Sequence, residues 1–479
     1  MARRYLRILS DEDMQKIHKA SLSILENTGM LIDHHEARNR LQEAGAKVNH
    51  ESKMVKFPPE LVEKSLESIP RTLTYAGRNL ENDMILKAGG DVYARTPGGA
   101  SSYIDLRTGE YRKARIGDMK EWAVLVDALP NINGCAPITA GDVPVQTADI
   151  HAVQVLLENQ TKHIMAQNFG LKNLNYMIEM MIAVRGSEEE LKKRPLCHCT
   201  MAIISPLYLT EDNVDRIILA GEYGIPVIIV TTATTGLSAP MTLAGTIALA
   251  NAEELGGLTV TQVMSPGAPA AYYMLPMVAN MSTGTGLWNT QENKMMQAAM
   301  IQLGIELYGM PIEAPALGAH GVNWEQSVAE KMIGSLMTGF AGANLLNGAG
   351  YVDTALAANP AQLVMDDEIM GVTRRMVRGI EVNDDTLGLE VISRVGPRGT
   401  FLTDEHTLKY LRTDEFFRPT IFDRDSRITW LSKGAKGLEQ KAKEKALTIL
   451  EEHKVPPLPE DVVKEVGSIV NKADQELAG

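Results

Sequence analysis

Aromatic and polar side chains recur where short apolar runs of the sequence give way to polar segments, and several of them could bind an organic cation. Aromatic faces attract a quaternary ammonium group, which has no N–H to donate in a hydrogen bond. A distant carboxylate would add charge complementarity. The residues of these types are Phe169, Tyr273, Trp288, Glu292, Glu313, His320 and Trp324. They predict a weakly charged pocket for a quaternary amine, with ordinary core packing as the competing interpretation of each aromatic ring.

Other familiar catalytic motifs do not account for the chain. The sequence has no phosphate-binding P-loop, and Gly284-Thr-Gly286 lacks the third glycine of a dinucleotide fingerprint. Cys197-His198-Cys199 could suggest zinc, but in a strand the two cysteines face one way and the histidine the other. These three residues could then supply two ligands at most, so we expect no metal site.

The elements that must position these residues alternate regularly. From about residue 114, eight predicted helices are each followed by a predicted strand. This pattern predicts an α/β fold of the (β/α)8 TIM-barrel type, with the site at the C-terminal ends of the strands. An open, doubly wound sheet is the alternative. The predicted strands are 131–138, 162–167, 197–203, 226–231, 270–274, 311–314, 344–346 and 390–395.

The barrel accounts for only part of the 479 residues. We expect an N-terminal helical and β-hairpin cap over 1–112, the barrel over 113–400 and a helical C-terminal extension over 401–479. The formal net charge is −13, so nucleic acid is not an expected partner. The sequence holds three cysteines, no signal peptide and no apolar run of spanning length, which predicts a cytoplasmic protein without a membrane partner.

Several longer motifs resemble one known family. The sequence is similar to the trimethylamine methyltransferase family, whose members are corrinoid-dependent barrels, from Ser10 to about Arg424. The motifs are specific together rather than singly. They are Gly236-Leu-Ser-Ala-Pro-Met-Thr-Leu-Ala-Gly245, Asn251-Ala-Glu-Glu-Leu255, Ser265-Pro-Gly-Ala-Pro269, the loop at Glu292, Leu346-Asn-Gly-Ala-Gly350 and Phe401-Leu-Thr-Asp-Glu-His-Thr407.

One departure from the family pattern bears on the substrate. The trimethylamine enzymes carry pyrrolysine in the loop that corresponds to Ala319-His-Gly-Val322, and this sequence has neither pyrrolysine nor lysine there. The chain therefore resembles the branch without pyrrolysine, which demethylates glycine betaine, proline betaine, carnitine or γ-butyrobetaine. A quaternary nitrogen leaves as a neutral amine and needs no special electrophile. Binding the substrate with one N-methyl group toward the barrel opening and excluding water would suffice.

Under this hypothesis we assign roles to individual residues. Glu292 and His320 are the catalytic candidates, Glu292 through long-range charge complementarity, and Phe169, Tyr273, Trp288 and Trp324 would surround the ammonium group. A betaine carboxylate needs donors as well. We expect them among Arg95, Tyr103, Gln167, His320 and Asn347.

The resemblance implies a separate corrinoid protein as the methyl acceptor, docked over the C-terminal face of the barrel, and no tightly bound cofactor. Asp404-Glu-His406 begins like a corrinoid-binding loop, but Lys409 stands where glycine belongs, so we interpret it as structural. A homo-oligomer is expected. Two alternatives stay open: a zinc-dependent thiol methyltransferase or barrel lyase that uses Cys197 and Cys199, and a non-catalytic quaternary-amine-binding subunit.

Overall fold

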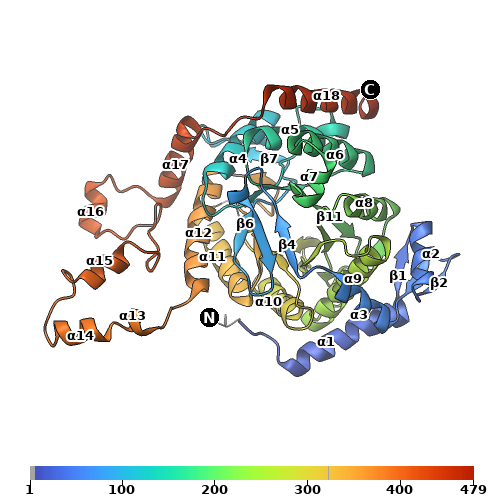
Figure 1. Ribbon diagram of the computed structural model, residues 1–479, viewed down its shortest axis with the longest axis horizontal. Coiled ribbons are helices and arrows are strands. Elements are labelled where there is room, and N and C mark those ends of the chain that lie inside the picture. Colours follow the sequence, from blue (N-terminus) through green and yellow to red (C-terminus); the bar gives the residue numbers. More distant parts are fainter. Residues whose placement is uncertain (1–5, 322) are drawn as a thin grey trace.

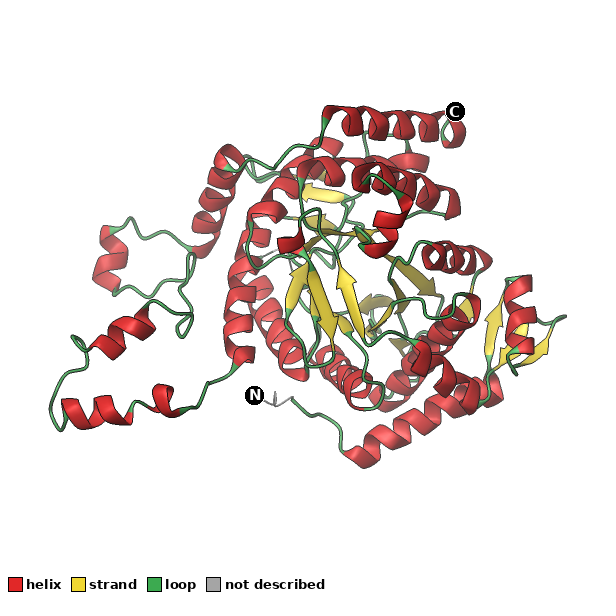
Figure 2. Cartoon of the chain, in the orientation of Figure 1, coloured by secondary structure: helices red, strands yellow, loops and turns green. Residues whose placement is uncertain are grey.

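The computed structural model describes residues 6–321 and 323–479 (Figure 1). Parallel strands close into a barrel at the centre, and helices surround them (Figure 2). In barrel order the strands are β6 (Tyr93–Arg95), β9 (Gly134–Cys135), β10 (His163–Ala166), β11 (Cys197–Ile203), β13 (Val227–Thr231), β15 (Ala270–Tyr273), β18 (Ile312–Pro315) and β19 (Leu345–Asn347). The predicted TIM-barrel class is therefore confirmed.

One of the eight predicted strands is wrong, and one barrel strand had been assigned to the cap. The first barrel strand is β6, which the sequence analysis had placed in the cap, and it pairs in parallel with both β19 and β9. Because β6 completes the closed barrel, no strand is needed after residue 377. The predicted strand at 390–395 is helix α14 (Leu389–Val395). Its short apolar run fits either periodicity, and Leu389 and Ile392 are exposed rather than buried in a sheet.

The barrel helices alternate with the strands. They are α4 (Ile116–Ala128), α5 (Ala148–Asn159), α6 (Leu171–Arg185), α7 (Glu188–Lys193), α8 (Glu211–Glu222), α9 (Leu243–Met264), α10 (Gln291–Glu306), α11 (Trp324–Ala341) and α12 (Pro360–Arg378). Helix α9 is buried on nearly all sides. A helix that is apolar all round must be covered, and α1 (Asp11–Ser23) and α3 (Pro59–Ser68) pack against it.

The N-terminal segment covers the flank and the closed end of the barrel. A π-helical turn (Ile24–Thr28), helix α2 (His35–Glu43) and a small sheet lie beside α9. That sheet contains β1 (Met30–Ile32), β2 (Lys47–Asn49), β3 (Met54–Lys56) and β12 (Tyr208–Leu209). The antiparallel pair β4 (Thr72–Tyr75) and β5 (Met84–Lys87), separated by a 3-10 turn at Leu80–Asn82, packs Leu73 and Tyr75 against Ile228 and Leu345 inside the barrel.

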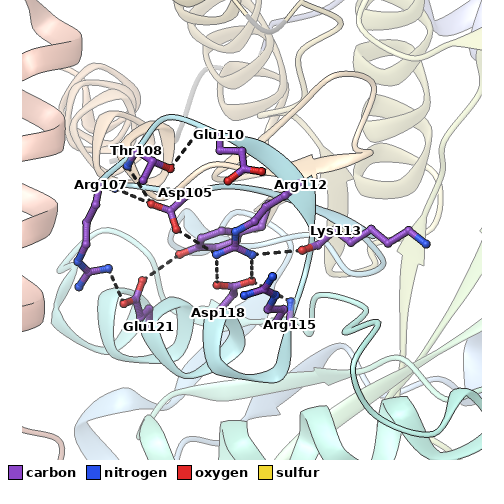
Figure 3. A network of polar contacts seen from close by, with 10 residues as sticks. Asp105, Arg107, Thr108, Glu110, Arg112, Lys113, Arg115, Asp118 and Glu121 are labelled. Carbon is purple, nitrogen blue, oxygen red and sulfur yellow. Dashed lines mark hydrogen bonds and ion pairs between the residues drawn. The ribbon is translucent and has the colours of Figure 1, made fainter.

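Two small sheets stand on the loops that follow the barrel strands. One contains β7 (Ser102–Ile104), β8 (Tyr111–Lys113), β20 (Tyr351–Val352) and β21 (Ala357–Ala358). The other contains β14 (Thr234–Thr235), β16 (Met277–Asn280) and β17 (Thr285–Leu287). Figure 3 shows how the first is fixed: Arg112 of β8 binds both carboxylate oxygens of Asp118 in α4 and also reaches Asp105.

The C-terminal extension has two parts. Residues 380–436, which we call the arm, run away from the barrel and carry α13 (Asp384–Leu387), α14, α15 (Glu405–Leu411) and α16 (Arg427–Ser432) (Figure 1). Helix α17 (Leu438–Glu452) then packs on α12, and α18 (Glu460–Leu477) packs on α6. Among the described helices, none combines the length and apolar character needed to cross a membrane.

Candidate active site

The barrel is open at the C-terminal end of its strands, which we call the mouth. Along β11, alternate residues His198, Thr200 and Ala202 face the interior, and their surroundings change from fully buried through half-buried to exposed. Ile228 and Val230 of β13 follow the same trend. Water therefore reaches the inner wall from the mouth but not from the end that the β4–β5 hairpin covers.

A polar cluster forms the floor of the mouth. Arg95, Tyr273, Glu313 and Asn347 come from β6, β15, β18 and β19, which are consecutive in the barrel. Arg95 donates from Nε to Glu313 Oε1 at 2.6 Å and also from Nη2. Asn347 Nδ2 lies 3.4 Å from both Glu313 Oε1 and the Tyr273 hydroxyl. Burial raises the pKa of Glu313 even though the Arg95 guanidinium opposes the rise.

Two histidines extend this cluster toward the closed end. His163 Nδ1 lies 3.0 Å from the Ala76 carbonyl oxygen, and His163 Nε2 lies 3.0 Å from His198 Nδ1. The Tyr75 ring stacks on both imidazoles, with centroids 4.5 Å and 4.6 Å away. Burial lowers the pKa of both histidines, that of His163 to about 3. The barrel interior below the mouth is thus a polar stack.

Two loops border the mouth near this floor. Trp288 is half-buried and packs against the apolar group that includes Tyr273. His320 is half-buried in the loop after β18, where its backbone N–H donates to Glu330 Oε2 at 2.7 Å. Its Nε2 is buried without a partner. Val322, the last residue of the loop 319–322, lies outside the described residues.

The remaining predicted residues are scattered. Gln167 and Phe169 line a narrow cleft after β10 with Pro137, Thr139 and Asp149. The Phe169 ring is 47% exposed, so its face is free to meet a ligand or another protein. Glu292 is exposed in the first turn of α10.

Two of the predicted site residues, Tyr103 and Trp324, make their contacts away from the mouth. Tyr103 is buried beneath Arg112, 5.4 Å from its guanidinium carbon, and its hydroxyl donates to Glu121 at 3.4 Å. It therefore joins the β7–β8 pair to α4 and does not reach the mouth. Trp324 begins α11 and packs against the main hydrophobic core.

The cysteines lie on the outer face of the barrel wall, as the strand alternation predicts. Cys135, Cys197 and Cys199 are free and buried. Cys197 and Cys199 belong to the core between strands and helices, whereas His198 points inward to Glu313. Cys197 and Cys199 therefore do not share a site with His198, as the zinc alternative would require. Within residues 6–321 and 323–479, no group of three or more His, Cys, Asp or Glu is placed to bind a metal ion.

The sequence analysis missed the part played by the polar stack. It placed Glu313 on the mouth but gave it no role, treated His198 only as a neighbour of two cysteines, and did not consider His163. A usable signal exists, because each of these residues is the ionisable, non-cysteine member of a short, mostly apolar strand. Strand alternation then places it inside the barrel.

Known proteins are similar to this chain in sequence and in fold. A trimethylamine methyltransferase MttB of Desulfitobacterium hafniense is 34% identical, with 98% of this chain and 94% of that protein covered. A glycine betaine methyltransferase of the same species is 28% identical, with 98% of each covered. The crystal structure of a hydroxylamine complex of MtmB shares the fold, with a TM-score of 0.52, 12% identity, and 93% and 94% coverage. The model of the family described as trimethylamine methyltransferase (MTTB) matches residues 2–478, and the chain therefore belongs to that family.

Proposed function

We propose that the protein is a methyltransferase that demethylates a quaternary amine of the betaine type and passes the methyl group to a separate corrinoid protein. The observation that carries this proposal is the mouth itself. Its inner wall, at Thr200, Ala202 and Val230, offers hydroxyl and aliphatic groups, while Arg95 contacts Glu313 on the floor. A substrate that needs no proton transfer in order to react suits such a site.

Exposed apolar side chains surround the mouth and support a protein partner. They lie in the loops that follow β6, β9, β10, β11, β13, β15 and β19, and solvent-exposed apolar groups gathered on one face of a protein commonly mark an interaction site. We call this set the apolar ring. Its members are Tyr111, Val145, Phe169, Ile204, Leu237, Met241, Met281 and Leu356. A partner protein seated on this ring would cover the open barrel.

In this reaction the chain would bind the substrate, and its partner would supply the methyl acceptor. When bound, a corrinoid on the partner would supply the nucleophile that accepts the methyl group. The residues of the mouth would bind the ammonium group, with Trp288 as the aromatic surface, and the docked partner would exclude water. Phe169, His320 and Glu292 are kept as peripheral candidates, because Phe169 and His320 lie on loops around the mouth and Glu292 lies in the first turn of α10, away from the floor.

The Asp404-Glu-His406 segment, which begins like a corrinoid-binding loop, makes its contacts within the arm. Asp404 caps α15 by accepting from the His406 backbone N–H, and it forms an ion pair with Arg394. His406 Nε2 lies 3.3 Å from the Asp385 carbonyl oxygen. Both side chains are thus used inside the arm, which supports a corrinoid on a separate protein.

A second candidate substrate is trimethylamine, because the relative that is 34% identical carries that substrate in its name. The test is anaerobic. The purified protein, a cobalt(I) corrinoid protein and one amine are mixed, and methyl-cobalt(III) formation is followed by absorbance. The panel is glycine betaine, proline betaine, carnitine, γ-butyrobetaine and trimethylamine. Activity on a quaternary amine alone supports the proposal, and activity on trimethylamine alone overturns it. Tight binding without demethylation would instead favour a binding subunit.

We also propose that the protein works in the cytoplasm as a homo-oligomer. The three cysteines are free, in agreement with a reducing compartment. The exposed apolar side chains of the arm support the oligomer.

A further inference from the structure

Two buried polar atoms face each other in the barrel without a hydrogen-bond partner. His198 Nε2 and Glu313 Oε2 are 3.5 Å apart, and both side chains are fully buried. A carboxylate oxygen is only an acceptor, and an unprotonated imidazole nitrogen is one too. Two lone pairs facing each other in a low-dielectric interior would be repulsive. One hydrogen between the two atoms removes the repulsion and satisfies both.

The neighbouring contacts decide which nitrogen of His198 lacks a hydrogen. The Ala76 carbonyl can only accept, so His163 Nδ1 carries a hydrogen and donates to it. Neutral His163 then has a bare Nε2, which must accept from His198 Nδ1. With its hydrogen on Nδ1, a neutral His198 presents a bare Nε2 to Glu313. The missing hydrogen therefore belongs to the His198–Glu313 contact.

We propose that one proton shared by His198 Nε2 and Glu313 Oε2 leaves the floor of the mouth with a net charge of +1, which selects substrates whose ammonium group is tethered to an anion. The balance is Arg95 at +1, the Glu313 carboxylate at −1 and the shared proton at +1. The sum is the same wherever the proton resides. The other titratable groups that touch this contact, His163, Tyr75 and Tyr273, are neutral in this arrangement.

Hydrogen-bond donors on the floor remain free to bind the anionic group of a ligand. The Tyr273 hydroxyl accepts from Asn347 and retains its own hydrogen for donation. Arg95 commits Nε and one hydrogen from each Nη to protein oxygens, so two of its five N–H groups remain. A carboxylate bound here would leave the ammonium group nearer to Trp288. A simple cation would meet only the repulsive charge.

This inference rests on the proposed function and identifies which end of the substrate the barrel floor recognises. It is tested by the ratio of kcat/KM for glycine betaine to that for choline, which has a hydroxyl where the betaine has a carboxylate. Wild type should prefer glycine betaine by about tenfold or more, the range of a hydrogen bond to a charged group. Arg95→Gln removes the positive charge, and His198→Leu lets Glu313 ionise against Arg95. Each should reduce the ratio toward one.

Glu313→Gln is the matched variant, because a glutamine amide reproduces a protonated carboxyl and keeps the sum at +1. Its selectivity ratio should stay close to the wild-type ratio, whatever its turnover. A ratio that falls as far in Glu313→Gln as in Arg95→Gln would overturn the proposal, because ionised Glu313 would then be the group that matters.

A second measurement needs no variant and no activity. In wild type with 15N-labelled histidine, the His198 resonances should show a protonated Nδ1 and an Nε2 that is hydrogen-bonded or protonated. A bare, unbonded Nε2 would refute the shared proton. If no quaternary amine is demethylated, the proposed function fails. Calorimetric binding of glycine betaine against choline then still tests the charge of the floor.

Discussion

Trp288 and Trp324 both follow barrel strands in the sequence, but their surroundings differ, and this difference predicts different effects of replacing them. Trp288 packs against the group that contains Tyr273, whereas Trp324 packs into the main core. Replacing Trp288 by leucine removes an aromatic face from the ammonium group. A cation–π contact is worth about 0.5–2 kcal/mol, so KM for the quaternary amine should rise by roughly 2- to 30-fold.

Steady-state demethylation at saturating corrinoid protein measures this change. Trp324→Phe is the control and should leave KM unchanged, since its ring lies outside the mouth. An unchanged KM in Trp288→Leu would remove Trp288 from the ammonium site, and an increase in Trp324→Phe alone would exchange the roles of the two residues.

At the scale of elements, α9 holds the loop after β11 in place through a buried carboxylate. Glu253 accepts from the Ser205 hydroxyl at 2.8 Å and from the Leu207 backbone N–H at 2.9 Å. Burial raises the pKa of Glu253 from 4.5 to about 7. The folded state thus retains a proton that the unfolded chain releases. Its contribution to the free energy of unfolding is greatest below pH 4.5 and declines as the pH rises toward 7.

Glu253→Gln removes this titration while keeping both contacts, since its amide nitrogen can donate to Ser205 and its oxygen can accept from Leu207. The stability of the variant relative to wild type should increase between pH 4.5 and 7, by up to about 3 kcal/mol. Urea unfolding across this range measures the difference. Glu292→Gln, at an exposed position, is the control for the same substitution outside this contact. A difference between Glu253→Gln and wild type that does not change with pH would show that Glu253 ionises normally in the fold.

The helices and strands show how much of this fold and site the sequence predicts. Alternation of helix and strand predicted the barrel, and strand parity predicted that Cys197 and Cys199 face away from His198. Neither periodicity nor composition could identify β6 as the closing strand, because its pairing with β19 joins residues some 250 positions apart. The contact of His198 with Glu313 is long-range too. The sequence did not predict that Tyr103 packs away from the mouth, because its position depends on contacts with Arg112 and Glu121.

On the scale of the whole molecule, the apolar ring should bind the corrinoid protein without contributing to amine binding. Leu237→Glu with Met281→Glu places two charges on the exposed loops after β13 and β15. We expect KM for the corrinoid protein to rise at least about tenfold, because burying an unpaired charge in an interface is costly. Calorimetric binding of the amine should stay unchanged. Equal loss of amine binding would indicate that these loops shape the substrate pocket instead.

The arm presents a larger apolar surface, at a different part of the molecule. It follows the C-terminal end of α12, and barrel helices run from the mouth end of the barrel to the opposite end, so the arm leaves the barrel away from the mouth. Its exposed apolar residues are Ile380, Val382, Leu387, Leu389, Ile392, Phe401, Leu402, Leu408, Leu411, Phe416, Ile428 and Leu431. Such a surface on a projecting segment is typical of an interface between copies of one chain.

The prediction is an oligomer that depends on this arm. Light scattering after gel filtration should give wild type a mass that is a multiple of 52.3 kDa. Leu389→Glu with Ile392→Glu should shift the mass to that of the monomer, because charges replace two exposed apolar groups on α14. The double variant Leu237→Glu with Met281→Glu is the control and should remain oligomeric, since the ring lies on the loops of the mouth and the arm projects from the side of the barrel at α12 (Figure 1). A monomeric wild type would refute this use of the arm. Loss of the oligomer in the control alone would assign the interface to the mouth, where it would compete with corrinoid docking.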